Sequence, residues 1–280
     1  MTGIRTARTA VALARATHPV PTAAVTVFTS VLAVAMGVGW GRIALLAAAV
    51  LAGQLSVGWL NDLVDRHRDR AAGRTDKPAA MAVVSPRTVT VAVGAAAAVC
   101  VPLSLSLGLA AGAAHLAAVG AAWGYNLGLK RTLWSWAPYA FSFGMLPVVV
   151  WLVAPAPGLP PGWMIGAAAL LGVGAHAANV LPDLDADRRA GVLGLPHRMS
   201  ASALRVSTVV LVFGAMLLLT FGPAERLSGW EVGALGLAAV LAVPAAGAAR
   251  LPLPPRAPFM AVVGIAVLAV GMLLIRGTAG

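Results

Sequence analysis

A series of apolar runs, each long enough to cross a bilayer, constrains the fold of this 280-residue chain most strongly. A helix needs about 20 predominantly apolar residues to span roughly 30 Å of hydrocarbon. With 60% hydrophobic and only 10% charged residues, the composition excludes a soluble globular domain. We therefore predict an all-α polytopic membrane protein, a single domain over residues 1–280 with nine transmembrane helices. The nine runs are at about 19–38, 42–60, 88–105, 108–127, 136–154, 162–181, 206–222, 229–248 and 257–275.

The basic residues between these runs predict the orientation of the chain. If the N-terminus is cytoplasmic, 17 of the 20 Lys and Arg residues lie in inner connections and three in outer ones. We therefore expect residues 1–18 to form a cytoplasmic segment and the C-terminus to lie outside, with the protein integral to the cytoplasmic membrane. The same spread of basic residues argues against a nucleic-acid partner. The single cysteine, Cys100, excludes an intrachain disulfide.

All seven aspartates fall in two short windows, each directly after an apolar run. The windows contain Asp62, Asp65, Asp69 and Asp76 in the first, and Asp183, Asp185 and Asp187 in the second. Ionisable side chains at the edge of a membrane are costly unless they face an interior or aqueous cavity, where they usually have a functional role. The predicted orientation places both windows on the cytoplasmic side, so we expect one shared acidic site.

Helical spacing would gather most of these side chains on two faces. If the helices continue through the windows, residues three and four apart share a face. The residues on these faces are Asp62, Asp65 and Asp69 in the first window, and Asn179, Asp183 and Asp187, with His176 before them, in the second. Carboxylates brought together near a low-dielectric region require cations. Oxygen ligands without cysteine favour a hard ion, Mg²⁺ first, with Mn²⁺ or Ca²⁺ after it.

Basic and phenolic residues beside the windows would complete a diphosphate site. Arg74 and Lys77 follow the first window in GRTDKP, and Lys130 and Arg131 follow the fourth run in YNLGLKR. These cations would neutralise a departing diphosphate. Tyr125 would offer a phenol to a phosphate or a π-face to a carbocation. A charged clamp beside apolar helices suits a substrate with a charged head and a hydrocarbon tail, which indicates a prenyl diphosphate.

The motifs Asn61-Asp62-x-x-Asp65-x-x-x-Asp69 and Asp183-x-x-x-Asp187, with nine spans and a Tyr and Lys-Arg pair between them, resemble the UbiA superfamily of intramembrane prenyltransferases. The resemblance implies helices around a central cavity and Mg²⁺ bridging both motifs to a prenyl diphosphate. It also implies ionisation to an allylic cation, which a hydrophobic or aromatic acceptor captures. The expected metal ligands are Asp62, Asp65, Asp69, Asp183 and Asp187; the expected substrate contacts are Asn61, Arg74, Lys77, Lys130, Arg131 and Asn179; the expected catalytic residues are Asp65, Asp69, Tyr125 and Lys130.

Alternatives remain open at this point. A terpene cyclase on the same scaffold would ionise the same diphosphate without an acceptor, so the clamp predicts both enzymes. A transporter is disfavoured, because the acids lie on one side with no ionisable relay to the other. For His115 and His176 we favour a hydrogen-bonded packing role over catalysis, and for His67 and His197 a loop role. The acceptor, the length of the prenyl chain and the oligomeric state are not determined by these residues.

Overall fold

The computed structural model describes residues 2–71, 73, 81, 83–223 and 229–247, together with seven single residues between 260 and 272. This part of the chain is helical and contains no strand, as predicted. The helices in chain order are α1 (Thr2–Ala16), α2 (Pro19–Ala35), α3 (Trp40–Ala71), α4 (Pro86–Leu105), α5 (Leu109–Leu127), α6 (Ala137–Val153), α7 (Gly162–Val180), α8 (Leu184–Arg189), α9 (Ala201–Phe221) and α10 (Gly229–Gly247). Three short 3₁₀ turns, η1 (Leu129–Arg131), η2 (Leu181–Asp183) and η3 (Leu195–Arg198), lie between them.

Local side-chain chemistry explains where several helices begin. Ser85 caps α4 by accepting a hydrogen bond from the Thr88 amide at 3.1 Å, and Ser200 caps α9 through the Ala203 amide at 3.1 Å. Between α1 and α2, His18 adopts a left-handed conformation with φ 54°, and the two helices are bent by 65°. The N-terminal helix therefore does not continue the axis of the first long one.

Glycines permit two close helix contacts. A Cβ at Gly172 of α7 would lie 2.5 Å from the carbonyl oxygen of Tyr139 on α6, closer than real Cβ atoms come. At Gly112 of α5 it would lie 2.6 Å from the carbonyl oxygen of Ser104 on α4. Only glycine lets these backbones approach so closely. The α6–α7 contact matters for the site, because it brings the C-terminal half of α7 against Tyr139.

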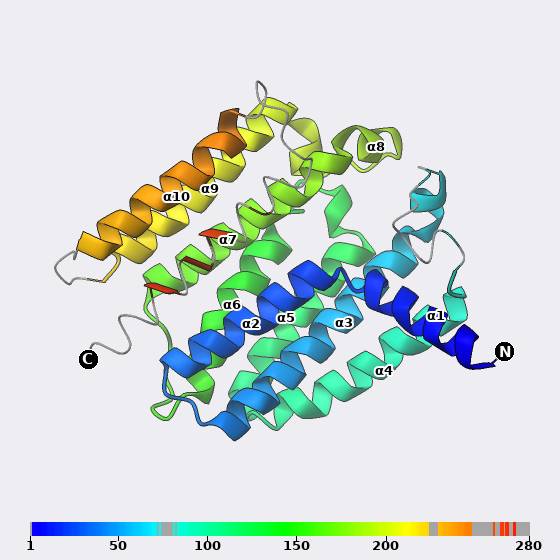
Figure 1. The fold of residues 1–280 in the computed structure, drawn as a ribbon, viewed down its shortest axis with the longest axis horizontal. Coiled ribbons are helices and arrows are strands. Elements are labelled where there is room, and N and C mark those ends of the chain that lie inside the picture. Colours follow the sequence, from blue (N-terminus) through cyan, green and yellow to red (C-terminus); the bar gives the residue numbers. More distant parts are fainter. Residues whose placement is uncertain are drawn as a thin grey trace.

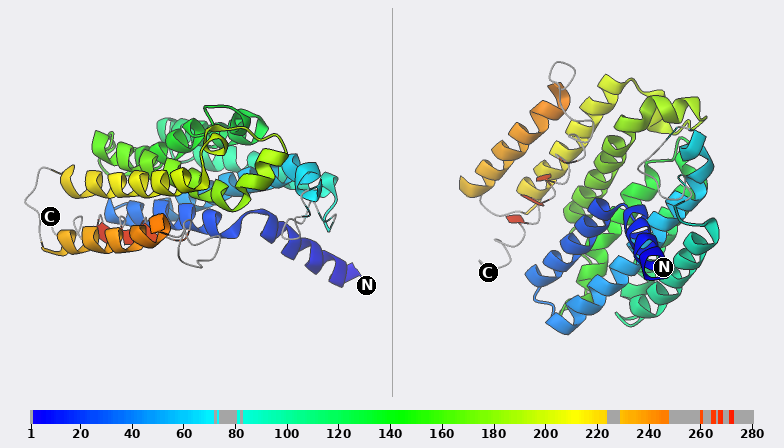
Figure 2. Two further views of the ribbon diagram at one scale, coloured as in Figure 1. Left: turned by 90° about the horizontal axis from the view of Figure 1, so that it is seen from above. Right: turned by 45° about the vertical axis from the view of Figure 1, so that its right-hand side comes forward.

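The long helices pack side by side, with α9 and α10 together at one edge of the molecule (Figures 1 and 2). One apolar cluster joins α2, α3 and α6, with Leu46 and Val150 fully buried, and a second joins α7 and α9 around Met216. The C-terminal end of α3 and the short helix α8 lie at the same end of the bundle (Figures 1 and 2). Parts of both acidic windows therefore lie at the same end of the bundle.

The predicted count of nine spans is not confirmed. Eight of the nine predicted segments coincide with described helices, whereas most of 257–275 lies outside the described residues. Within the described part, four helices are long and apolar enough to cross a membrane, or five if the bent α1–α2 pair is one span. Helix α6 has 17 residues, about 25 Å at 1.5 Å per residue, which is shorter than the hydrocarbon core. Helix α5 is not among the candidate spans; it contains the polar residues His115 and Asn126.

Candidate functional site

The first three aspartates of the first window lie on a continuous helix and are buried, whereas Asp76 lies outside the described residues. Helix α3 extends to Ala71, so Asp62, Asp65 and Asp69 follow one another at helical spacing on a single face. Their exposed fractions are 0%, 4% and 4%. Three carboxylates are almost never buried together on one helix face unless they are paired with cations.

The second window lies on a helical segment, Gly162–Arg189, that is not regular α-helix throughout, because a 3₁₀ turn interrupts it. Helix α7 ends at Val180, the turn η2 follows, and α8 begins at Leu184. The reason is Pro182, which has no N–H to donate and whose ring disturbs the preceding helical turn. Asp183 ends the turn and Asp187 lies in α8, while Asn179 near the end of α7 is exposed. The expected single stripe from Asn179 to Asp187 is therefore broken at the proline.

Arg68 connects the two windows. Its Nη2 lies 2.9 Å from Asp65 Oδ2 and 3.6 Å from Asp69 Oδ1, and its Nη1 lies 3.8 Å from Asp187 Oδ1. The guanidinium thus receives carboxylates from α3 and from α8 on separate nitrogens. Sequence analysis assigned no role in the site to Arg68, although its position three residues after Asp65 was a signal for an i,i+3 pair.

Lys130 adds a second cation from the connection after α5. Its Nζ donates to Asp65 Oδ1 at 2.5 Å, and both side chains are 4% exposed. Burial lowers the pKa of the Lys130 ammonium, and the neighbouring Asp65 carboxylate opposes this shift. The expected neighbour Arg131 is exposed. Of the Lys-Arg pair, only Lys130 is buried against the acidic site.

The side-chain amides of Asn61 and Asn126 form a hydrogen-bonded pair at the start of the first window. Asn61 Nδ2 donates to Asp65 Oδ2 at 3.2 Å and to Asn126 Oδ1 at 3.0 Å, while Asn126 Nδ2 donates to the carbonyl of Val57 at 3.0 Å. Asn126, which sequence analysis did not single out, therefore links α5 to α3 one turn below the aspartates. Asn61 is oriented by this link, and its amide contacts the carboxylate directly.

The segment after α8 folds back on the second window. His197 Nε2 lies 3.2 Å from Asp187 Oδ2, and the side chain of His197 is buried. Arg188 fixes the same segment by donating to the carbonyl of His197 at 2.8 Å and to that of Met199 at 2.6 Å. His197 was expected to be a loop residue, and it does lie in η3, but its ring contacts a window carboxylate. By contrast, the Asp185 side chain is 80% exposed and contacts only the Arg188 guanidinium in the described part of the chain.

Ser135 joins the Lys130 connection to the segment after α8. Its Oγ accepts a hydrogen bond from the Leu195 amide at 3.2 Å and lies 3.3 Å from His176 Nε2. A Cβ at Gly194 would lie 2.5 Å from the carbonyl oxygen of Lys130, so the two loops are in close backbone contact. The position of Lys130 therefore depends on the loop that also carries His197.

An aromatic group lies beside the carboxylates. The Tyr125 ring meets Tyr139 edge to face with a centroid separation of 5.0 Å and meets His176 at 5.4 Å. The rings of Tyr139 and His176 are stacked at 4.7 Å. Tyr125 is also within electrostatic range of Asp65, Asp187 and Arg68. His176 therefore has the packed, hydrogen-bonded environment expected of it, and Tyr125 is packed against it.

Two of the predicted basic residues, Arg74 and Lys77, lie outside the described residues. His115, the other membrane histidine, lies 2.8 Å from Ser104 Oγ through its Nδ1 and is buried, in agreement with a packing role. The residues of the site that sequence analysis missed are Arg68, Asn126, Ser135 and His197. Asn126, Ser135 and His197 reach the site through tertiary contacts that no local pattern indicates, whereas Arg68 pairs with Asp65 within α3 and reaches Asp187 only through the fold.

The donor set fits a hard divalent cation. No group of three or more His, Cys, Asp and Glu side chains within the described ranges forms a ready metal cage. Mg²⁺ does not require one, because it is usually held by one or two carboxylates with water and substrate phosphates. Oxygens of Asp65, Asp69 and Asp187 converge within 4 Å on the Arg68 guanidinium, which already stands where a cation is attracted.

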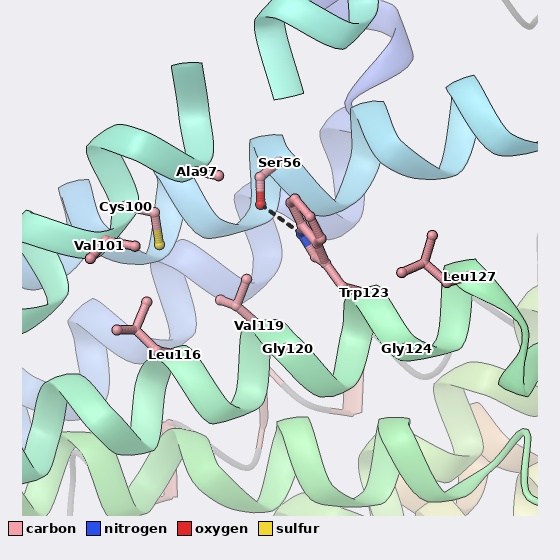
Figure 3. A pocket seen from close by; sticks show the side chains of 10 residues that line it. All are labelled: Ser56, Ala97, Cys100, Val101, Leu116, Val119, Gly120, Trp123, Gly124 and Leu127. Carbon is pink, nitrogen blue, oxygen red and sulfur yellow. Dashed lines mark hydrogen bonds between the residues drawn. The ribbon is translucent and has the colours of Figure 1, made fainter. Parts of the chain in front are cut away.

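A separate apolar pocket of about 390 Å³ lies between α3, α4 and α5 (Figure 3). Apolar side chains and two glycines, Gly120 and Gly124, form most of its wall. The indole of Trp123 crosses it and donates a hydrogen bond to Ser56 Oγ at 3.1 Å. None of the window aspartates lines this pocket, so it is distinct from the acidic site.

Comparisons with known proteins agree with this architecture. A model of the UbiA prenyltransferase family matches residues 20–260. A UbiA homologue from Archaeoglobus fulgidus bound to GPP and Mg²⁺ has a similar structure, with a TM-score of 0.72 and 15% identity over 96% of this chain and 100% of that one. The apo structure of a UbiA homologue from Aeropyrum pernix K1 has a TM-score of 0.70 and 20% identity, over 91% of this chain and 97% of that one. A structure of digeranylgeranylglyceryl phosphate synthase has a TM-score of 0.64 and 14% identity, over 97% of both chains. No curated protein sequence matches the chain.

Proposed function

The chain belongs to the UbiA prenyltransferase family, and from this premise we propose that it is an Mg²⁺-dependent intramembrane prenyltransferase. It moves an isoprenyl group from a prenyl diphosphate to a hydrophobic or aromatic acceptor. The observation that carries the proposal is the convergence of carboxylates from both acidic windows on one cationic group, Arg68. A diphosphate with its metal is the ligand that such a paired acidic site suits.

Asp62, Asp65 and Asp69 on α3 would hold the metal from one side, and Asp183 and Asp187 from the other. When bound, Mg²⁺ would neutralise the diphosphate and make it a better leaving group. Similar structures of this family contain Mg²⁺ together with GPP or DMAPP, which supports the assignment.

Basic residues would receive the charge that develops on the diphosphate. As the bond between the prenyl C1 and the diphosphate oxygen breaks, its electron pair leaves with the diphosphate and an allylic cation remains. The buried ammonium of Lys130, which donates to Asp65, would be one of the cations near that charge. By the sequence pattern, Arg74, Lys77 and Arg131 would also help to neutralise the diphosphate, and Asn61 and Asn179 would contact the donor.

The π-face of Tyr125 would stabilise the allylic cation. Its ring is packed against Tyr139 and His176, which fix its orientation. The acceptor then supplies an electron pair to C1 and loses a proton. We place the acidic site at the cytoplasmic face of the cytoplasmic membrane, with the N-terminus inside, because the basic residues gather in the connections at that face.

The proposal is tested with the purified full-length protein in detergent. Geranyl, farnesyl and geranylgeranyl diphosphate are each supplied with Mg²⁺ and a panel of aromatic and lipid acceptors, and pyrophosphate and prenylated product are measured. We expect equal amounts of both products with the correct donor and acceptor. Asp187→Asn should lose at least about a hundredfold in turnover, since a ligand of the metal is removed.

Asp185→Asn is the matched control, because this aspartate is in the same window but 80% exposed. It should retain near-normal turnover. A cyclised hydrocarbon or alcohol formed from the donor alone would show a terpene cyclase instead. Normal pyrophosphate release by Asp187→Asn would show that the proposed site is not the catalytic one.

A further inference from the structure

We propose that Arg68 is an internal counterion that occupies the place of the divalent cation between the two windows until the prenyl diphosphate binds with its metal. This inference rests on the proposed function of the site. It assigns to Arg68 a positioning and gating role, in which its bonds to Asp65 and Asp187 are exchanged for bonds to the diphosphate.

The contacts of Arg68 are with carboxylates of both windows, which a divalent cation would also bind. Its guanidinium lies 2.9 Å from Asp65 on α3 and 3.8 Å from Asp187 on α8, so one side chain joins the windows across the site. A divalent cation shared by these carboxylates would need oxygens at about 2.0–2.1 Å. A guanidinium and a metal cannot both occupy the space between them, because their positive charges repel and their ligand oxygens are the same.

Burial identifies which of the two cations can move. Lys130 is 4% exposed and its backbone is packed against Gly194, whereas the Arg68 side chain is 21% exposed. Arg68 also lies in the last turn of α3, three residues before Ala71, where the helix ends. Its long side chain can therefore turn toward solvent or toward a diphosphate while Lys130 stays on Asp65.

This exchange couples the binding of metal to that of the donor. Metal alone must displace Arg68 without giving it another partner, so it binds weakly. Metal with a diphosphate supplies phosphate oxygens to which the guanidinium can form a bidentate hydrogen bond. The acidic site is thus kept together without metal, and it opens to metal mainly when the donor arrives.

The test measures binding of Mn²⁺ to the full-length protein in detergent by electron paramagnetic resonance, with no donor present. Arg68→Gln removes the charge but keeps a hydrogen-bonding side chain. We expect it to lower the half-saturating Mn²⁺ concentration about tenfold, since one competing cation is removed. Adding inorganic pyrophosphate should tighten Mn²⁺ binding strongly in the wild type and much less in Arg68→Gln.

Arg66→Gln is the matched control, because Arg66 is on the same helix but donates to the carbonyl of Leu63 at 2.7 Å. It should change the half-saturating concentration by less than about twofold, because its charge is not placed between the carboxylates. Arg68→Lys keeps the charge but has fewer hydrogen-bond donors, so its half-saturating Mn²⁺ concentration should lie between those of the wild type and Arg68→Gln. It replaces Arg68→Gln in the test if the glutamine variant is misfolded.

The inference is overturned if Arg68→Gln binds Mn²⁺ no more tightly than Arg66→Gln, or more weakly than the wild type. In the latter case Arg68 would be a partner of the metal complex and not its competitor. If the wild type shows turnover but Arg68→Gln gives either of these two binding results, only the inference about Arg68 fails. If the wild type neither binds Mn²⁺ with pyrophosphate nor releases pyrophosphate from a donor, the proposed function itself fails.

Discussion

Replacing Lys130 by methionine tests the electrostatic design of the site directly. Methionine keeps most of the hydrocarbon stem and removes the ammonium that donates to Asp65 at 2.5 Å. Both side chains are 4% exposed, so neither partner can recover the lost interaction through water. The variant should therefore be less stable than the wild type without any metal or substrate.

The expected magnitude follows from what remains around Asp65. Removing one partner of a fully isolated buried pair costs about 3–5 kcal/mol, because an uncompensated charge is left behind. Here Asp65 keeps Arg68 at 2.9 Å and Asn61 at 3.2 Å, both on its other oxygen. The loss is then closer to that of one charged hydrogen bond, about 1.5–3 kcal/mol.

The assay is the free energy of unfolding in detergent with EDTA present. The exposed neighbour Arg131→Met is the control and should change it by less than about 0.5 kcal/mol. In the double variant Lys130→Met/Asp65→Asn the losses should not add, since the second change removes the charge that the first left unpaired. An additive double variant, or a Lys130→Met loss no larger than that of Arg131→Met, would refute the buried-pair reasoning.

Two further predictions concern packing and are read from the same unfolding measurement. Gly172→Ala should cost about 1–3 kcal/mol, because the new methyl group would lie 2.5 Å from the carbonyl oxygen of Tyr139. Gly120→Ala, which meets no atom within 4 Å, should cost well under half of that, and an equal loss in both variants would contradict the close α6–α7 contact. Trp123→Phe removes the hydrogen bond to Ser56 and should cost about 0.5–1.5 kcal/mol, whereas no loss would show that the bond is not maintained.

Much of the fold could be predicted because it depends on hydropathy and spacing along single helices. The buried face of Asp62, Asp65 and Asp69 follows from helical periodicity alone once α3 is known to continue past the apolar run. The interruption in the second window could also have been predicted, because Pro182 lacks the N–H that a regular helix needs. The four-residue spacing of Asn179 and Asp183 favoured a regular helix instead. The number of membrane-crossing helices was harder, because length and hydropathy are marginal in α5 and α6.

The contacts that complete the site could not be predicted because they join distant parts of the chain. His197 reaches Asp187 only because Arg188 folds the intervening segment back through two backbone carbonyls. Ser135 is one of many small polar residues by sequence, and its role depends on Leu195 arriving beside it. Arg68 could not be told from Arg66 and Arg70 by sequence, since all three are arginines of the same connection, and only the fold brings Asp187 to it.

The placement of the first window at the end of α3 has an electrostatic consequence. The C-terminus of a helix carries a partial negative charge, so carboxylates in the last turns are disfavoured there and cations are favoured. Asp69 lies in the last turn of α3 and Asp65 one turn earlier, while Arg68 and Arg70 supply the basic residues of that last turn. The aspartates therefore sit where the helix itself repels them, and burial increases the cost. Such an arrangement requires cations close to the carboxylates, and Arg68 and Lys130 supply them in this structure. Under the proposed function, a metal–diphosphate complex would meet the same electrostatic requirement in place of the Arg68 guanidinium.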